Sequence, residues 1–278
     1  MDRQDIIEIG LRFIRKSKSN FIKKEIALSA EVEGMRIFDD PIFALGDADD
    51  QYFARLKDPS IVGEHFMLPK EWLSQAKTVI SFFLPFSKMV KNSNKKDKLW
   101  PSEGWLHGRI EGQTLLNSLS LQLHKELLKQ GYQSIIPSLS KSYWSRSGYN
   151  TDNQIIDDQT RNLPVFTSNW SERHVGFVCG LGTFGLSRGL ITKKGVAGRF
   201  GSMITDLHME PDMREYDHFS EYCSGCGECI KQCPVHAISF KEGKSHFLCS
   251  EFLEKIRIKY QPRFGCGKCQ VNVPCENC

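Results

Sequence analysis

No cysteine occurs before Cys179 in this chain of 278 residues, although the chain has ten cysteines. Nine of the ten lie between Cys223 and Cys278. A secreted scaffold held together by disulfides is usually short and carries cysteines along its whole length. The uneven distribution therefore predicts a local site for a prosthetic group near the end of the chain.

Long apolar stretches are also missing. No segment approaches the roughly 18 apolar residues of a membrane-spanning helix, and the longest run, TVISFFLPF, is short and contains Pro85. The first residues, MDRQDIIEIGLRFIRKSKSN, lack the apolar core and cleavage site of a secretory signal. A twin-arginine export signal is missing as well. We therefore expect a cytoplasmic, soluble protein with no membrane partner.

The chain has little excess charge of either sign. Its formal net charge is +4, with 40% hydrophobic and 25% charged residues, which is typical of a folded globular protein. Because a clustered basic surface matters more than the total, this charge does not indicate a nucleic-acid partner. The lysine-rich stretch SKMVKNSNKKDKLW is predicted to be a solvated loop, with a phosphate-contacting patch as the alternative.

Apolar spacing predicts a mixed α+β fold before the cysteines. We expect an amphipathic helix at the start of the chain, a buried strand from Thr78 to Leu84, and a helix from Gly112 to Gln130 followed by a short strand. A helix is expected over 171–180, and a β-hairpin in GLITKKGVAGRFGSMITD. Residues 139–168 are polar and predict a long loop, which is usually functional or mobile. The boundary of the cysteine region is expected near residue 212.

The sequence CSGCGECIKQCP, from Cys223 to Pro234, has the spacing C-x2-C-x2-C-x3-C-P. This spacing is typical of [4Fe–4S] ferredoxins, in which three cysteines bind one cluster and the fourth binds the other. We therefore predict two clusters that exchange one ligand each. Cys233 is the cysteine of this run that would cross to the second cluster.

The end of the chain, FGCGKCQVNVPCENC, supplies the remaining thiols. Val273 stands where a second Cys-Pro is expected, and Cys275 lies beyond Pro274. The first cluster is predicted to have the ligands Cys223, Cys226, Cys229 and Cys275, with Cys278 as the alternative to Cys275. The second is predicted to have Cys233, Cys249, Cys266 and Cys269. One cluster with another metal, or structural zinc, remains an alternative.

Other motifs carry weaker signals. CGLGTFG, at residues 179–185, has the glycine spacing of a dinucleotide site, with Asp206 about 20 residues further on. The segment after it predicts a strand where that site needs a helix, so close backbone packing is the preferred interpretation. Cys179 is expected to be a buried structural cysteine.

The candidate proton donors and histidines have mainly structural interpretations. Tyr143, Arg146 and Tyr149 are candidates for proton transfer, although packing is the commoner role of aromatic loop residues. His174, His208 and His236 have no metal-ligand spacing among themselves.

The run SNWSERHVGFVCGLGTFGLSRGLITKKGVAGRFGSMITDLHMEPD, followed by CSGCGECIKQCPVHAI, Cys249 and FGCGKCQ, resembles the epoxyqueuosine reductase family, which is related to the corrinoid reductive dehalogenases. The resemblance covers about residues 165–275. It implies a nitroreductase-like α+β domain at 1–212 that holds a cobalamin, and a ferredoxin-like domain at 213–278 with two [4Fe–4S] clusters. It also implies that electrons from a donor such as a ferredoxin or flavodoxin pass through the clusters to cobalt.

Three departures from the family pattern bear on the substrate. Phe166 occupies the position of the family's aspartate proton donor, the helical-repeat extension that grips tRNA does not follow Cys278, and the last cysteine lies beyond Pro274. They disfavour true epoxyqueuosine reduction on tRNA. We expect an iron–sulfur oxidoreductase acting on an unidentified small molecule. The alternative is a non-catalytic electron-transfer or accessory protein.

Overall fold

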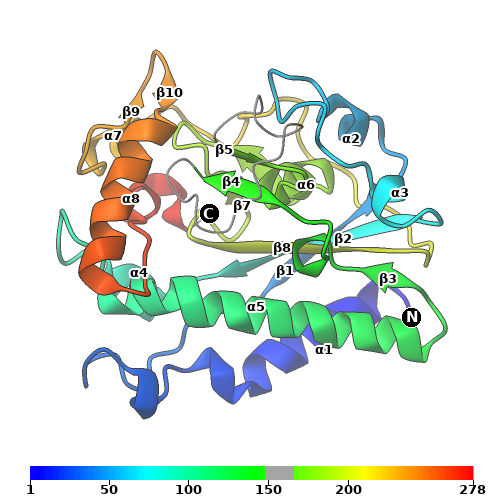
Figure 1. The fold of residues 1–278 in the computed structure, drawn as a ribbon, viewed down its shortest axis with the longest axis horizontal. Coiled ribbons are helices and arrows are strands. Elements are labelled where there is room, and N and C mark those ends of the chain that lie inside the picture. Colours follow the sequence, from blue (N-terminus) through cyan, green and yellow to red (C-terminus); the bar gives the residue numbers. More distant parts are fainter. Residues whose placement is uncertain (148–165, 278) are drawn as a thin grey trace.

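A four-stranded antiparallel sheet organises the computed structural model, which describes residues 1–147 and 166–277 (Figure 1). The strand order is β1-β2-β8-β3, and the bounds are Ile42–Asp47 for β1, Thr78–Pro85 for β2, Gly198–Thr205 for β8 and Ser134–Ile135 for β3. The mixed α+β class is therefore confirmed.

The position of strand β2 explains why its sequence is mostly apolar. It lies between β1 and β8, and successive side chains of a strand point to opposite faces. Ile80, Phe82 and Leu84 enter one hydrophobic core, whereas Val79 and Phe83 enter the other. Because both faces of the sheet are covered, all eight residues of this strand are buried.

Helices α1 (Arg3–Lys16) and α5 (Glu103–Lys129) cover one face of the sheet (Figure 1). Helix α5 begins where the Ser102 hydroxyl accepts a hydrogen bond from the Trp105 backbone N–H. It ends before Gly131, whose φ of 85° favours glycine. The predicted helix is confirmed, although it begins nine residues earlier than expected (112 − 103).

Helices α2 (Gln51–Arg55), α3 (Pro69–Trp72) and α6 (Glu172–Val178) lie on the other face. Their core is built around Trp170, which stacks on Phe66 with ring centroids 5.5 Å apart. Trp170 lies two residues before the first residue of α6, so this packing fixes the start of the helix relative to the sheet.

The cysteine region lies at one end of the sheet. Its elements are α7 (Glu228–Lys231), β9 (Ile238–Ser239), β10 (Gly243–Lys244), α8 (His246–Tyr260) and two 3₁₀ turns, η4 (Lys268–Gln270) and η5 (Pro274–Glu276). Helix α8 packs Phe252 and Ile256 against Leu106, near the start of α5. The region is therefore attached to the sheet domain through an apolar contact.

Short elements connect these layers. They are η1 (Lys18–Asn20), η2 (Lys24–Ile26), α4 (Lys88–Ser93), η3 (Pro137–Leu139), β4 (Ser145–Ser147), β5 (Phe166–Ser168), β6 (Gly182–Phe184) and β7 (Leu190–Thr192).

Two predictions were wrong. The strand β7 pairs with β6 and not with β8, because β8 continues into the central sheet and pairs with β2 and β3. The lysine-rich stretch contains helix α4, and its lysines include Lys91, which is buried, and Lys95, which forms an ion pair with Glu276 at 2.8 Å. These lysines hold the end of the chain, so the stretch is not simply a solvated loop.

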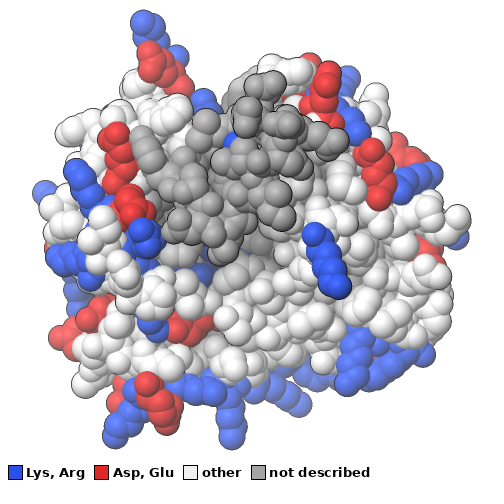
Figure 2. Space-filling view, in the orientation of Figure 1, with Lys and Arg blue, Asp and Glu red and all other residues white. Residues whose placement is uncertain are grey.

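The surface combines both signs of charge. On the face shown in Figure 2, acidic and basic side chains alternate on the left, and basic ones predominate along the lower edge. Among the described residues, no helix combines the length and the apolar character that crossing a membrane requires.

Candidate iron–sulfur site

The first group of cysteines surrounds a cavity. Cys223, Cys226, Cys229 and Cys275 line a cavity of about 180 Å³, together with Ile191, Tyr222 and glycines of the loop. A single water needs only about 10–15 Å³ of such space, so the cavity has room for a group much larger than one ion. These are the four cysteines that the sequence assigned to the first cluster.

The loop of the first three cysteines depends on glycine. Gly225 and Gly227 have φ values of 66° and 73°, in the left-handed region that favours glycine. These two left-handed residues, one on each side of Cys226, bend the backbone around the cavity. They explain why one glycine lies in each gap between the cysteines of CSGCGEC.

The turn around Pro274 brings Cys275 to the cavity. Val273, at the position expected for cysteine, is 7% exposed and packs with Ile191 and Val196. The Val196 backbone N–H donates a hydrogen bond of 3.0 Å to the Cys275 carbonyl. The chain therefore buries a valine where the family pattern has a cysteine, and supplies the next thiol two residues later.

Further contacts fix this end of the chain. The carboxylate of Glu276 accepts a hydrogen bond from the Asn272 N–H at 2.6 Å, in addition to the Lys95 ion pair. Lys91 donates a hydrogen bond to the Asn277 side chain. These contacts hold the residues on both sides of Cys275. Cys278, the alternative ligand, lies outside the described residues.

The second group of cysteines comes from α8, from η4 and from two connecting segments, those after α7 and before η4. Cys233 and Cys249 pack in the same apolar cluster as Cys269. Burial raises the pKa of the Cys269 thiol, Lys244 opposes this, and negative charge on Cys249 and Cys233 increases it further. Burial also raises the pKa of Cys266 to about 12, with Cys269 and Cys249 among the causes. The four thiols predicted for the second cluster therefore lie in one neighbourhood.

The two groups adjoin each other. Cys229, of the first group, packs in the same cluster as Cys233, Cys249 and Cys269. Burial raises its pKa to about 11, and Cys269 is the next cause, ahead of Cys223. Two clusters held by these groups would thus be neighbours.

The donor set fits iron–sulfur clusters. The eight thiols predicted as ligands would provide two sets of four, which is the ligand number of two [4Fe–4S] clusters. Within 1–147 and 166–277, no three His, Cys, Asp or Glu side chains converge in the way that binding a single metal ion requires. The first set instead stands around a cavity, as ligands of a larger group would.

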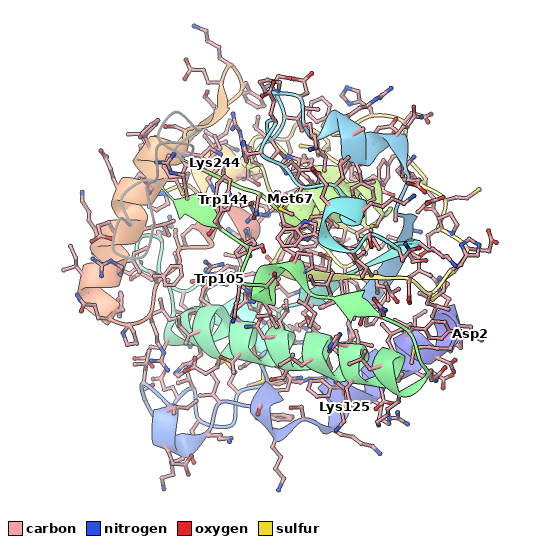
Figure 3. All side chains as sticks on the ribbon, turned by 45° about the vertical axis from the view of Figure 1, so that its right-hand side comes forward. Asp2, Met67, Trp105, Lys125, Trp144 and Lys244 are labelled. Carbon is pink, nitrogen blue, oxygen red and sulfur yellow. The ribbon has the colours of Figure 1, made fainter. Side chains whose placement is uncertain are left out.

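The second cysteine loop is pressed against α5. At Gly267, with φ of 68°, a Cβ atom would lie 1.9 Å from the ring of Trp105, which Figure 3 labels on α5. Lys268 is 2% exposed and donates hydrogen bonds to the carbonyls of Asn94 and Asp97, at 2.7 and 2.6 Å. The loop between Cys266 and Cys269 is thereby fixed to the sheet domain.

Two cationic side chains face the second group. Burial lowers the pKa of Arg173, and the charges of Cys269 and Cys249 oppose that effect. Lys244, labelled in Figure 3, is also penalised by burial, but Cys269 and Cys249 raise its pKa overall. Thiolates that ligate iron would find their counter-charges here.

Glu172, at the start of α6, is a functional candidate that the sequence did not single out. Burial raises its pKa to about 7, although a hydrogen bond from the Ser202 hydroxyl at 2.7 Å opposes this. Ser202 in turn accepts a hydrogen bond from the Trp170 indole N–H at 2.8 Å. Trp170 and Glu172 both lie in SNWSERHVGF, which is part of the run that carries the family resemblance. The sequence therefore contained a clue to Glu172.

The other predicted candidates have mostly structural surroundings. Phe166 stacks its ring on His246, with centroids 5.2 Å apart, so an aromatic contact occupies the family's aspartate position. Burial raises the pKa of Tyr143, and the charge of Glu172 adds to the increase. Arg146 lies on β4, and Tyr149 is outside the described residues.

The glycine motif near Cys179 serves packing. Strand β6 occupies residues 182–184 and pairs with β7, and a Cβ on Gly182 would lie 1.9 Å from the Ile191 carbonyl oxygen. No helix follows the glycines, so the dinucleotide geometry is not formed in this segment. Cys179 is 0% exposed, and burial raises its pKa.

The three histidines that the sequence singled out are not gathered together. His174 packs on Phe184, His208 lies near Glu210, and His236 adopts a φ of 50° beside Cys233.

Comparisons with known proteins agree with this site. The family model described as a 4Fe–4S binding domain matches residues 216–239, which include Cys223, Cys226, Cys229 and Cys233. No curated protein matches the chain. The chain therefore contains a 4Fe–4S binding domain.

Solved structures show where this fold occurs. An epoxyqueuosine reductase in complex with an epoxyqueuosine-modified tRNA-Tyr stem loop is 19% identical, with a TM-score of 0.50, over 97% of this chain and 65% of that one. The enzyme from Streptococcus thermophilus is 19% identical, with a TM-score of 0.48, over 84% and 61%. A catabolic reductive dehalogenase is 14% identical, with a TM-score of 0.44, over 85% and 30%.

The chain spans about three-fifths of the length of the epoxyqueuosine reductases. At these identities the likeness concerns the fold. The predicted resemblance is confirmed at that level: this is an iron–sulfur protein that shares its fold with the epoxyqueuosine reductases.

Proposed function

We propose that the chain is a reductase in which two [4Fe–4S] clusters pass electrons to a small molecule bound in the sheet domain, at residues 1–212. The observation that carries the proposal is the arrangement of Cys223, Cys226, Cys229 and Cys275 around a cavity of about 180 Å³. The second group, Cys233, Cys249, Cys266 and Cys269, adjoins it through Cys229. The clusters, when bound, would supply electrons one at a time.

The placement of the two groups suggests a direction for the electrons. Cys226 is exposed, so the first group reaches the surface, where a donor such as a ferredoxin or flavodoxin can approach. The second group faces Arg173 on α6 and is fixed to α5 through Gly267. We infer that electrons enter at the first group and leave from the second toward the sheet domain.

A reduction also needs protons. Glu172 has a pKa of about 7, so a fraction of its carboxyl groups holds a proton at neutral pH, as an effective general acid requires. Its Oε1 atom is buried and has no hydrogen-bond partner. We infer that this carboxyl group holds or gives the proton, a role that the resemblance gives to an aspartate at position 166.

A corrinoid enters this proposal only through the resemblance. No contact among the described residues identifies a place for it, so none of the steps above depends on it. Titration of the anaerobic protein with cobalamin, followed by absorbance, tests this element separately. A spectral change at one equivalent would support a corrinoid reductase, and an unchanged spectrum would remove the corrinoid from the proposal.

The central test is the iron and sulfide content of protein purified without oxygen. We expect about eight irons and eight sulfides per chain, four for each cluster, and an electron paramagnetic resonance signal on reduction. About four irons would contradict the second cluster, and zinc in place of iron would overturn the redox function. Reduced protein that is never reoxidised by any small molecule would favour the carrier alternative.

A further inference from the structure

Three arginines from three separate elements lie in one neighbourhood. Arg109 is on α5, Arg173 on α6 and Arg199 on β8. Burial, together with the charge of Arg173, lowers the pKa of Arg109 to about 10. Burial also lowers the pKa of Arg199, and both other arginines contribute. Like charges close to one another, with two of the three side chains half-buried, are more stable with a counter-charge nearby.

The described contacts of these arginines do not supply that counter-charge. Arg199 donates a hydrogen bond to the neutral side chain of Gln113, and Arg109 lies over the ring of Phe264 at 4.9 Å. The Nε atoms of Arg109 and Arg199 are buried without a hydrogen-bond partner. Among the ion pairs of the described residues, none involves Arg109, Arg173 or Arg199.

Other partly buried arginines of the chain have carboxylate partners. Arg263 pairs with Glu111, and Arg214 pairs with Asp50. Arg109 and Arg199 therefore differ from these arginines, because no carboxylate partner is found for them among the described residues.

The cysteines account for one of the three arginines. Arg173 is close enough to Cys269 and Cys249 for their charges to raise its pKa, so cluster thiolates can balance it. No cysteine acts in this way on Arg109 or Arg199. These two guanidinium groups have no counter-ion among the described residues.

We propose that Arg109 and Arg199, together with Arg173, bind an oxyanion, a phosphate or carboxylate group of the molecule that is reduced. The guanidinium fork matches such groups with two parallel hydrogen bonds. All three side chains keep some exposure: Arg173 is exposed and the other two are half-buried, so a ligand can reach them. The assignment to the substrate rests on the proposed reductase function, whereas binding of an anion does not.

The position would also help the reduction. Arg173 links the three arginines to Cys249 and Cys269 of the second group, from which electrons are proposed to leave. An anion held there would bring the attached molecule near that group. Fixed positive charges would also stabilise the negative charge that develops when an electron arrives.

The test is anaerobic titration calorimetry of the cluster-containing protein with inorganic phosphate, pyrophosphate and citrate at low salt. We expect at least one of these probes to bind, and Arg109→Gln and Arg199→Gln each to weaken its binding about tenfold or more. Arg109→Lys, which keeps the charge, should lose less than Arg109→Gln. The control is Arg55→Gln, on the exposed helix α2, which should bind as the unchanged protein does.

Each outcome is informative. The site would be overturned if Arg109→Gln and Arg199→Gln bound all three probes as tightly as the unchanged protein does. It would also be overturned if the unchanged protein bound none of them. Iron content and cluster absorbance of every variant separate this from the reductase function: anion binding without clusters would keep the site and reject the reductase. If the two variants weaken cobalamin binding but not binding of cobinamide, which lacks the nucleotide-loop phosphate, the oxyanion belongs to a corrinoid and the substrate assignment is overturned.

Discussion

The sheet domain and the cysteine region are stabilised in different ways. The sheet domain has two large apolar cores, one on each face of the sheet, with many side chains that are completely buried. The cysteine region has only small clusters, each built on three buried residues, and the partly buried residues packed against them include most of its cysteines. A segment with so little apolar core usually needs a metal site to fold.

This difference suggests a division of labour. We therefore expect the sheet domain to be stable without a cofactor, and the cysteine region to acquire much of its stability from bound iron–sulfur clusters. Several contacts join them, among them α8 on Leu106, Gly267 on Trp105, and hydrogen bonds or ion pairs made by Lys91, Lys95 and Lys268. The predictions below test this division.

Removal of iron should have the largest effect. Chelation of the anaerobic protein is expected to unfold residues 213–277 and leave the sheet domain folded, because only the first depends on the ligands. Hydrogen exchange read by mass spectrometry would show this as loss of protection in α8 and β9 with retained protection in β2 and α5. If both regions lost protection together, the division near residue 212 would be wrong.

Single cysteine changes should remove one cluster at a time. Cys275→Ser is expected to disturb the cluster of Cys223, Cys226 and Cys229, whereas Cys233→Ser should disturb the other one. Each change should therefore lower the iron content by about four per chain, with different electron paramagnetic resonance signals remaining. Cys179→Ser is the control, since this buried cysteine belongs to neither group.

An unchanged iron content in Cys275→Ser would point to Cys278 as the ligand. Loss of the same signal in Cys275→Ser and Cys233→Ser would contradict the exchange of ligands between the two groups.

Two matched glycine changes separate steric contact from backbone strain. Gly195 and Gly131 have φ values of 86° and 85°, but a Cβ on Gly195 would lie 2.0 Å from the Glu276 carbonyl oxygen, whereas nothing lies within 4 Å at Gly131. Gly131→Ala should cost about 1–2 kcal/mol from strain. Gly195→Ala should cost about 1–3 kcal/mol more, because the end of the chain must move.

The readouts of this pair are denaturant unfolding and iron content. Gly195→Ala should also reduce the iron content by moving Cys275, and Gly131→Ala should not. Equal effects of the two substitutions would show that the contact with Glu276 does not position the ligand.

The features that the sequence predicted are those encoded by local spacing. The cysteine motif, strand β2 and helix α5 each follow from residues close together in the chain. The pairing of β7 was missed because β8 pairs more extensively with β2, which lies far away in the sequence. The roles of Lys91 and of the three arginines were missed for the same reason: their neighbours lie on other elements, and no short motif records them.

The smallest expected effect concerns the pH dependence of stability. Glu172 is raised from 4.5 to a pKa of about 7 by burial, so between these values the folded protein binds a proton that the unfolded chain does not. Its contribution to stability therefore falls as pH rises through this window.

Glu172→Gln, which keeps the hydrogen bond from Ser202, should remove this dependence. The free energy of unfolding of the variant, relative to that of the unchanged protein, should increase by about 1 kcal/mol between pH 6 and pH 8. Urea unfolding at both values measures it, with Glu254→Gln on the exposed side of α8 as the control. A constant difference across this range would show that Glu172 is already ionised at pH 6, and it would then not hold the proton that the proposed reduction requires.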